Sequence, residues 1–260
     1  MSSMPARVIF DSTGGGAWNM AVDQALLMSA EQDGIVTLRL YAWEQPTLSL
    51  GYFQRYDDRQ LHAASLACPV VRRRSGGGAI LHDQELTYSL AVPSSHRWSN
   101  QNSELYDLVH QVVIRLLAQD GVESQLYKNV SSQQSNDRDD AQTPRIDPHA
   151  FLCFQRRSDG DLVSDGFKIL GSAQRRLKHS LLQHGSLLLG RSEFAPELPG
   201  LLELAGKRIE FEEFSRRISK SLGDALGFDF TPAELTESEV QLAGELEAAT
   251  FGASNWTQKR

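Results

Sequence analysis

The sequence predicts an α+β fold in which mixed, mainly antiparallel sheets are flanked by helices. Strand-like and helical patterns are mixed along the 260 residues without the strict strand–helix repeat of a doubly wound sheet. Strand-like segments at residues 161–164, 167–174 and 181–189 are separated only by turn residues, which is typical of successive antiparallel strands. The C-terminal part of the chain is helical, so the two kinds of element are partly segregated.

Apolar periodicity places the elements of the first half of the chain. Residues 19–28 predict a helix, because Met20, Val22 and Leu26 are apolar while Asp23 faces elsewhere. Residues 85–92 predict a strand, because apolar and polar residues alternate there. The other expected elements of this half are strands at 6–10, 36–43, 47–52 and 69–73 and a short helix at 57–67.

The second half begins with an amphipathic helix, expected at residues 103–120. Residues 131–148 are almost free of apolar side chains and predict a mobile polar surface loop. Beyond the three strands, a helix is expected at 214–225, where Gly227 stands in the position of a C-terminal cap. Thr236 opens a last helix with a capping-box pattern.

Composition limits the function classes. With 260 residues, 40% of them hydrophobic, the chain can bury a sizeable core, and we expect one domain over residues 1–260. A net charge of −7 excludes a basic nucleic-acid binder, whereas clusters of positive charge at 72–74, 156–157 and 175–178 suggest an anionic ligand or an acidic partner. No secretory signal and no apolar run near the roughly 20 residues that span a bilayer are found. Two cysteines fit a reducing compartment, so we expect a cytoplasmic protein without membrane or nucleic-acid partners.

The first functional motif is an apolar strand that runs into three arginines and then three glycines. Alternate residues of a strand face opposite sides, so Arg72 and Arg74 are expected to flank the glycine turn while Arg73 points away. Bare backbone beside fixed positive charge suits a carboxylate, a phosphate or a thioester carbonyl. The alternative is a tight turn with solvated arginines. The candidate binding residues are Arg72, Arg74, Ser75, Gly76, Gly77, Gly78 and His82.

The second functional motif runs from Cys153 through Lys168. Neighbouring positive charge favours the thiolate, the nucleophilic form of cysteine. A lysine inside an apolar strand is costly unless it has a partner, and its ammonium could stabilise a thiolate and an oxyanion. The alternative for Cys153 is an inert buried side chain, which is how we interpret Cys68. The candidate binding residues of this motif are Gly171, Ser172, Ala173, His184 and Gly185.

These segments resemble the biotin/lipoate protein ligase superfamily over most of the chain. Its lipoate-binding glycine loop is similar to Arg73-Arg74-Ser75-Gly76-Gly77-Gly78-Ala79 with His82-Asp83. Its lysine strand is similar to Lys168 with Gly171-Ser172-Ala173-Gln174, and the strand after it to Gln183-His184-Gly185-Ser186. The resemblance implies the catalytic-domain fold of that superfamily.

Within the superfamily, the spacing of Cys153 and Lys168 resembles the cysteine–lysine pair of one octanoyltransferase branch. The resemblance implies that Cys153 takes an octanoyl (or lipoyl) group from the thioester of acyl carrier protein, assisted by Lys168. The group would then pass to a lysine of a lipoyl domain, as a step of protein lipoylation. Implied acceptors are lipoyl-domain proteins such as the glycine cleavage H protein or the E2 subunit of a 2-oxoacid dehydrogenase. A thioester is already activated, so this route requires no cofactor and no metal.

Three other functions remain open from the sequence. An ATP-dependent lipoate–protein ligase would use ATP and Mg to activate free lipoate, with Cys153 idle. An amidotransferase would move the acyl group between two lipoyl domains. A non-catalytic module would only bind carrier proteins, a function against which Cys153 and Lys168 argue. The triple-glycine loop does not discriminate, because true ligases share it.

Overall fold

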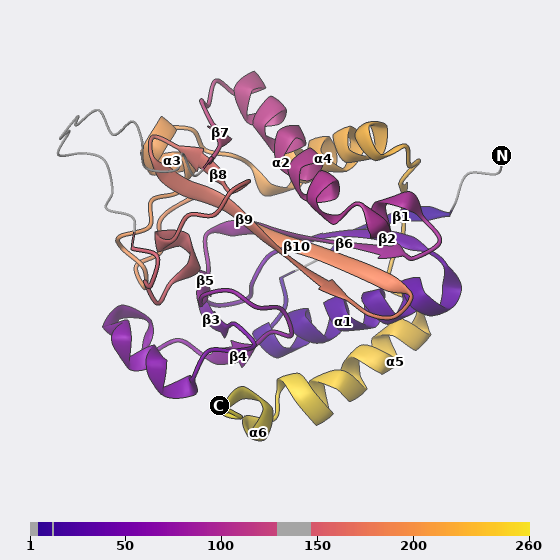
Figure 1. The fold of residues 1–260 in the computed structure, drawn as a ribbon, viewed down its shortest axis with the longest axis horizontal. Helices are drawn as coiled ribbons and strands as arrows, with labels where there is room; N and C mark the ends of the chain where they lie inside the picture. The colour runs from indigo at the N-terminus through magenta and orange to yellow at the C-terminus, as the bar shows by residue number, and fades with distance from the viewer. Residues whose placement is uncertain (1–4, 12, 129–146) are drawn as a thin grey trace.

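The computed structural model describes residues 5–11, 13–128 and 147–260, and Figure 1 shows their arrangement. Within these residues, eight strands form a large sheet in the order β11-β1-β2-β6-β10-β9-β8-β7, and three form a small sheet in the order β4-β3-β5. The large sheet comprises β1 (Ala6–Phe10), β2 (Val36–Tyr41), β6 (Glu85–Pro93), β7 (Gln125–Leu126), β8 (Leu162–Ser164), β9 (Phe167–Arg176), β10 (Ser180–Leu188) and β11 (Thr231–Pro232). The small sheet comprises β3 (Thr47–Leu50), β4 (Val70–Arg72) and β5 (Ile80–His82).

Long helices cover the large sheet, and short helical segments lie in the loops and near the C-terminal end. The long helices are α1 (Gly16–Asp33), α2 (Asn102–Gln119), α4 (Phe211–Leu226) and α5 (Glu237–Leu246). The short ones are α3 (Leu201–Ala205), α6 (Ser254–Thr257), the 3₁₀ turns Tyr56–Leu61, Ala63–Ser65, Arg97–Asn100 and Cys153–Gln155, and the π-helical turn Glu247–Phe251. In the described ranges, no helix has the length and apolar character needed to cross a membrane.

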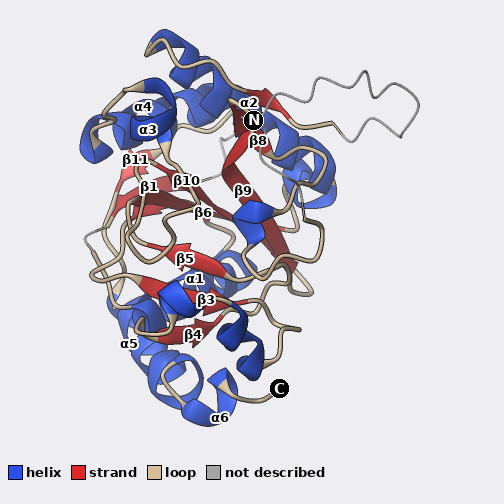
Figure 2. Cartoon of the chain, turned by 90° about the vertical axis from the view of Figure 1, so that its left-hand side faces the viewer, coloured by secondary structure: helices blue, strands red, loops and turns tan. Residues whose placement is uncertain are grey.

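The large sheet separates two helical layers, as Figures 1 and 2 show. Helices α2 and α4 cover one face, where they pack on apolar side chains of β1, β2, β6 and β10. Helices α1 and α5 lie on the opposite face, where a second apolar cluster joins α1 to Tyr41, Trp43 and Phe251. The small sheet packs on the same side as α1 (Figure 2).

Strand pairing confirms the α+β prediction. The segments expected at 161–164, 167–174 and 181–189 are β8, β9 and β10, which pair antiparallel in succession. The pairs β10–β6 and β2–β6 are also antiparallel, whereas β1–β2, β1–β11 and β3–β4 are parallel. The sheets are therefore mixed and mainly antiparallel.

One face of strand β6 is polar and nevertheless buried. Its alternation sends Leu86, Tyr88 and Leu90 towards α2 and α4. Thr87 and Ser89 point to the other face, where they are only 2% and 1% exposed. The polar face of such a strand commonly meets water. Here α1 and the small sheet cover it, so the polar side chains become the floor of an internal site.

Helix ends follow the expected cap chemistry. Gly227 ends α4 in the left-handed region with φ of 79°, which glycine adopts without a steric cost. The Thr236 hydroxyl accepts from the backbone N–H of Glu239, and the Glu239 side chain reaches back to complete the capping box of α5. Both predicted caps are confirmed.

Other local predictions differ from the structure. Residues 57–67, expected as a short helix, form the 3₁₀ segments Tyr56–Leu61 and Ala63–Ser65. The first of them buries no residue, so no apolar face supports a longer helix there. Helix α1 is longer than the expected 19–28 and is buried on most sides, so that even Asp23 is only 3% exposed. The expected polar loop at 131–148 lies, up to residue 146, outside the described residues.

Candidate active site

Cys153 is positioned by a backbone bridge between its own loop and the glycine loop. The Cys153 N–H donates to the Ala79 carbonyl at 2.7 Å, and the Ala79 N–H donates to the Phe151 carbonyl at 3.0 Å. A Cβ placed on Gly78 would lie 3.1 Å from the Cys153 Cα, so a side chain at residue 78 would crowd the close approach of the two loops. The thiol-bearing residue stays partly exposed.

The ammonium of Lys168 lies 3.7 Å from the Cys153 Sγ. Lys168 is a β9 residue and is 5% exposed, so its charge is held inside the protein. A Cβ on Gly171 would lie 2.4 Å from the Lys168 Cε, which shows that this glycine leaves the space that the lysine chain fills. The structure thus places side by side the two residues that the sequence singled out for catalysis.

Asp161 is the partner that the buried lysine requires. Its Oδ2 lies 2.8 Å from the Lys168 Nζ and accepts from the Ser158 N–H at 2.8 Å, and its Oδ1 accepts from the Tyr106 hydroxyl at 3.1 Å. Asp161 is 2% exposed. Three donors around one buried carboxylate fix its orientation, and the carboxylate in turn fixes the ammonium next to the sulfur.

A cavity of about 300 Å³ opens beside Cys153 and lies between the two sheets. Ile80 and Phe154 supply apolar walls, and Tyr41 and Met20 close the side next to α1. Most of the predicted binding residues line this cavity, namely Gly76, Gly77, His82, Gly171, Ser172, Ala173, His184 and Gly185. Of the others, Gly78 packs behind Cys153 and Ser75 reaches the cavity through its bond to His184.

The arginine that reaches the cavity is Arg73, which the sequence analysis expected to point away. Its guanidinium donates to the carbonyls of Gly76 at 2.9 Å and Gly78 at 2.6 Å, and so shapes the glycine loop from inside. Burial lowers the pKa of Arg73 to about 10, and the neighbouring Cys153 opposes that shift. Arg73 therefore stays charged at neutral pH and supplies a second positive charge near the sulfur.

Arg72 and Arg74 do not line the cavity, and the expectation that they share its face is wrong. Arg72 is fully buried and donates to the carbonyls of Gly51 and Thr257, where it holds loops together. The guanidinium carbon of Arg74 lies 4.9 Å from the centre of the Trp256 ring. Strand β4 ends at Arg72, so the alternation of a strand does not extend to the two arginines that follow.

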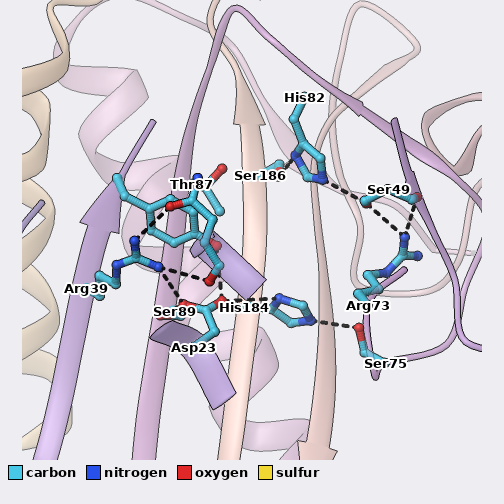
Figure 3. Close-up of polar contacts among 12 residues, drawn as sticks. Asp23, Arg39, Ser49, Arg73, Ser75, His82, Thr87, Ser89, His184 and Ser186 are labelled. Carbon is cyan, nitrogen blue, oxygen red and sulfur yellow. Dashed lines mark hydrogen bonds and ion pairs between the residues drawn. The ribbon is translucent and has the colours of Figure 1, made fainter. Parts of the chain in front are cut away.

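A chain of hydrogen bonds runs from Arg73 across the cavity wall to the large sheet (Figure 3). Arg73 donates to the Ser49 Oγ at 3.1 Å, which lies 2.8 Å from the His82 Nε2. The His82 Nδ1 lies 2.7 Å from the Glu85 Oε1. The Trp43 ring stacks on the His82 ring with 3.8 Å between the ring centres, which fixes the orientation of the imidazole. The histidine is thus clamped between the small sheet and β6.

A second chain fixes His184 on the opposite wall (Figure 3). The His184 Nε2 lies 2.8 Å from the Ser75 Oγ of the glycine loop, and its Nδ1 lies 3.7 Å from the Asp23 Oδ2. Asp23 is itself held by Arg39 at 3.0 Å and by the Ser89 hydroxyl at 2.8 Å. Both histidines therefore have hydrogen-bond partners within the protein, and their carbon atoms remain available to contact an apolar ligand.

We expect mildly acidic pH to destabilise the fold, because two buried histidines, His184 and His110, are held neutral. Burial lowers the pKa of His184 and that of His110 to about 4, so both are neutral in the folded protein at neutral pH. The unfolded chain protonates them near pH 6.5, so between pH 6.5 and 4 it binds more protons than the folded protein. The free energy of unfolding should fall across this window by at most about 1.4 kcal/mol per pH unit for each histidine.

Chemical denaturation across this pH window measures the slope. The variant His184→Gln should show a shallower fall than the parent, because one titrating group is gone. An unchanged slope in this variant would contradict the assignment of His184 as a buried neutral histidine.

Sequence reasoning missed the residues that support the site rather than form it. Asp161, Glu85, Asp23 and Ser49 are not among the predicted site residues. One signal was present, because a lysine in an apolar strand demands an acidic partner and Asp161 stands just before β8. In the described ranges, no group of three or more His, Cys, Asp or Glu side chains is arranged to hold a metal ion.

Curated relatives are similar over nearly the whole chain. The octanoyltransferase LipM of Kyrpidia tusciae is 31% identical over 281 residues, which cover 98% of this chain and 98% of the relative. The LipM of Geobacillus kaustophilus is 32% identical over 94% of each chain, and that of Bacillus subtilis is 28% identical over 98% of each.

Solved structures share the fold. A putative lipoate protein ligase from T. acidophilum superimposes with a TM-score of 0.76 at 20% identity and covers 99% of this chain and 100% of its own. A lipoate-protein ligase A bound with ATP gives a TM-score of 0.75 at 20% identity, over 98% of this chain and 99% of that one. Residues 16–235 match the model of the lipoyl protein ligase A/B catalytic domain. The chain therefore belongs to the lipoyl protein ligase A/B catalytic domain family.

Proposed function

We propose that this protein is an octanoyltransferase that moves an octanoyl group from a carrier thioester to a lipoyl-domain lysine through an acyl-enzyme on Cys153. The observation that carries the proposal is the 3.7 Å contact between the Cys153 Sγ and the Lys168 Nζ beside a cavity. An idle cysteine would not need a buried ammonium next to it, whereas a nucleophilic thiolate does. The LipM octanoyltransferases, similar over nearly the full chain, support the same activity.

In the first step, the Cys153 thiolate attacks the carbonyl carbon of the donor thioester. A carbon–sulfur bond forms to Cys153, and the bond to the carrier sulfur breaks. The carrier leaves as a thiol and takes up the proton that Cys153 lost. Lys168 stabilises the thiolate before attack and the oxyanion during it, and Asp161 holds the ammonium in place at 2.8 Å.

In the second step, the neutral ε-amine of the acceptor lysine attacks the same carbonyl carbon. The amide bond forms, the bond to the Cys153 sulfur breaks, and the amine proton passes to the departing thiolate. Both steps exchange one acyl bond for another, so neither ATP nor a metal takes part. The acceptors implied are lipoyl domains, and one solved neighbour from Thermoplasma acidophilum is described together with its E2 lipoyl domain.

The cavity suits a short acyl chain. Its volume of about 300 Å³ lies at the lower end of the usual range for small-molecule sites. Each buried methylene contributes about 0.8 kcal/mol, so a chain that fills the cavity binds more tightly than a shorter one. A chain that is too long meets the side chains of Tyr41 and Met20, which close the side next to α1.

The proposal is tested by incubating the protein with octanoyl–acyl carrier protein in the absence of ATP. Intact-mass measurement should show one added octanoyl group on the enzyme, and adding a lipoyl domain should move that group to the acceptor. Octanoyl-lipoyl-domain as the donor tests amidotransfer, and free lipoate with ATP and Mg tests the ligase reaction. The proposal would be overturned if the carrier thioester gave no adduct and the protein instead incorporated free lipoate in an ATP-dependent reaction.

A further inference from the structure

Four basic side chains gather beside the glycine loop, and we call Arg74, Arg175, Lys259 and Arg260 the basic collar. The Arg175 guanidinium donates to the Arg74 carbonyl at 3.0 Å, which joins β9 to the segment after β4. Lys259 and Arg260 lie over the ring of Tyr52 at 3.4 and 5.5 Å. The collar therefore brings together three segments that are distant in the sequence, and Figure 1 shows the C-terminal end next to β4.

Among the described residues, the collar's side chains lack an acidic ion-pair partner. In the described part of the chain, none of these four residues has a carboxylate within the 4.0 Å of an ion pair. The cations rest on aromatic rings instead, and Lys259 lies 3.5 Å from the centre of the Trp256 ring. Lys259, and then Arg260, lowers the pKa of Tyr52, as expected where positive potential is uncompensated.

The basic pair at residues 156–157 does not offer the same surface. Arg156 donates to the Ala150 carbonyl, and Arg157 donates to the carbonyls of Phe154 and Gly166. Their guanidinium groups hold the loop that carries Cys153. On a chain with a net charge of −7, the collar is thus a local concentration of positive charge.

The collar borders the entrance of the acyl cavity. Arg175 and Ala173 share one face of β9, and Ala173 lines the cavity. A small depression lined by Arg74 and Arg175 shares Arg73, His184 and Met20 with the cavity. Gly77 is exposed and lies at the opening. A partner bound on the collar would therefore hold its reactive group close to Cys153.

An exposed aromatic side chain completes the surface. Phe53 is 70% exposed, and its ring lies 3.9 Å from the position of a Cβ on Gly76. The Tyr52 N–H donates to the Ser75 carbonyl at 2.9 Å, which fastens this aromatic pair to the glycine loop. Aromatic and arginine side chains together are the composition typical of protein-binding surfaces.

Resting on the proposed function, we infer that the basic collar with Phe53 is the docking surface for the acyl donor, a strongly acidic carrier protein. Charge complementarity selects this occupant, because a negatively charged carrier is drawn to this positive surface beside the entrance. Its thioester arm then enters between the glycine loop and β9. The inference assigns this surface to the donor and not to the acceptor lipoyl domain.

The test reverses two collar charges and measures each substrate separately. The variant Lys259→Glu/Arg260→Glu should raise KM for octanoyl–acyl carrier protein about 10-fold, with a weaker salt dependence. The rate with octanoyl-pantetheine, a small thioester without a protein, and KM for the lipoyl domain should not change. Lys259→Gln/Arg260→Gln should give a smaller effect in the same direction.

A matched control reverses two exposed charges on the far face of the large sheet, Arg216→Glu/Lys220→Glu in α4 (Figure 1), and should leave every parameter unchanged. If KM for the carrier is unchanged in the collar variant, the inference is overturned. If KM for the lipoyl domain rises instead, the inference is also overturned, and the collar is assigned to the acceptor. Direct binding of labelled octanoyl–acyl carrier protein is measured in parallel. If the parent protein transfers no acyl group, the proposed function fails, while the binding measurement still decides whether the collar docks the carrier.

Discussion

Replacing Cys153 with alanine is expected to abolish the octanoyl adduct and to lower acyl transfer by roughly 10³-fold or more, because the proposed acyl-enzyme forms on the Cys153 sulfur. The fold should be retained, since Cys153 is partly exposed and its backbone N–H still donates to Ala79. Intact-mass measurement after incubation with octanoyl–acyl carrier protein detects the adduct directly.

The matched control for this prediction is Cys68→Ala. Cys68 is 5% exposed, and burial raises the pKa of its thiol, so it is poorly suited to attack a thioester. This variant should accumulate the same adduct as the parent protein. An octanoyl group found on the Cys153→Ala enzyme would show that the nucleophile lies elsewhere.

Removing the ammonium beside the sulfur should have the second largest effect. Lys168→Met keeps the length of the side chain but not the charge, and should lower the rate of acyl-enzyme formation by roughly 10²- to 10³-fold. The variant also leaves the Asp161 carboxylate buried without its cation, which costs on the order of 3–5 kcal/mol of stability. Single-turnover formation of the adduct measures the chemical effect, and denaturation measures the stability.

A double variant separates these two effects. Lys168→Met/Asp161→Asn removes both charges, so it should regain much of the lost stability while staying as inactive as Lys168→Met. The single variant Asp161→Asn keeps the ammonium but loosens it, and should lose only about 10-fold in rate. Recovery of activity in the double variant would mean that Lys168 contributes to folding alone and that its catalytic role is wrong.

The elements with strong local signals were predictable from the sequence. The alternation in residues 85–92 and the apolar stripe of residues 103–120 both correspond to observed elements, β6 and α2. The predicted family is also confirmed by the match over residues 16–235. The signals for the strand and the helix are short-range, because each depends on the spacing of apolar residues within one element.

Predictions that required the direction of individual side chains were less successful. Strand alternation over residues 72–74 predicts that Arg73 points away from the face shared by Arg72 and Arg74. The strand, however, ends at Arg72. The turn into the glycine loop then redirects Arg73 to the cavity. Where a chain leaves regular structure, the alternation rule no longer fixes a side chain's direction.

The sequence by itself determined the candidate reactive groups: a thiol, an ammonium fifteen positions later, and a glycine loop whose backbone is open to a ligand. Only the tertiary structure decided which of these groups meet and what surrounds them. Packing the small sheet and α1 over the polar face of β6 and β10 forced Glu85, Asp23 and the histidines to pair with one another. Buried polar groups must find partners, and those partners come from segments whose proximity no local pattern encodes.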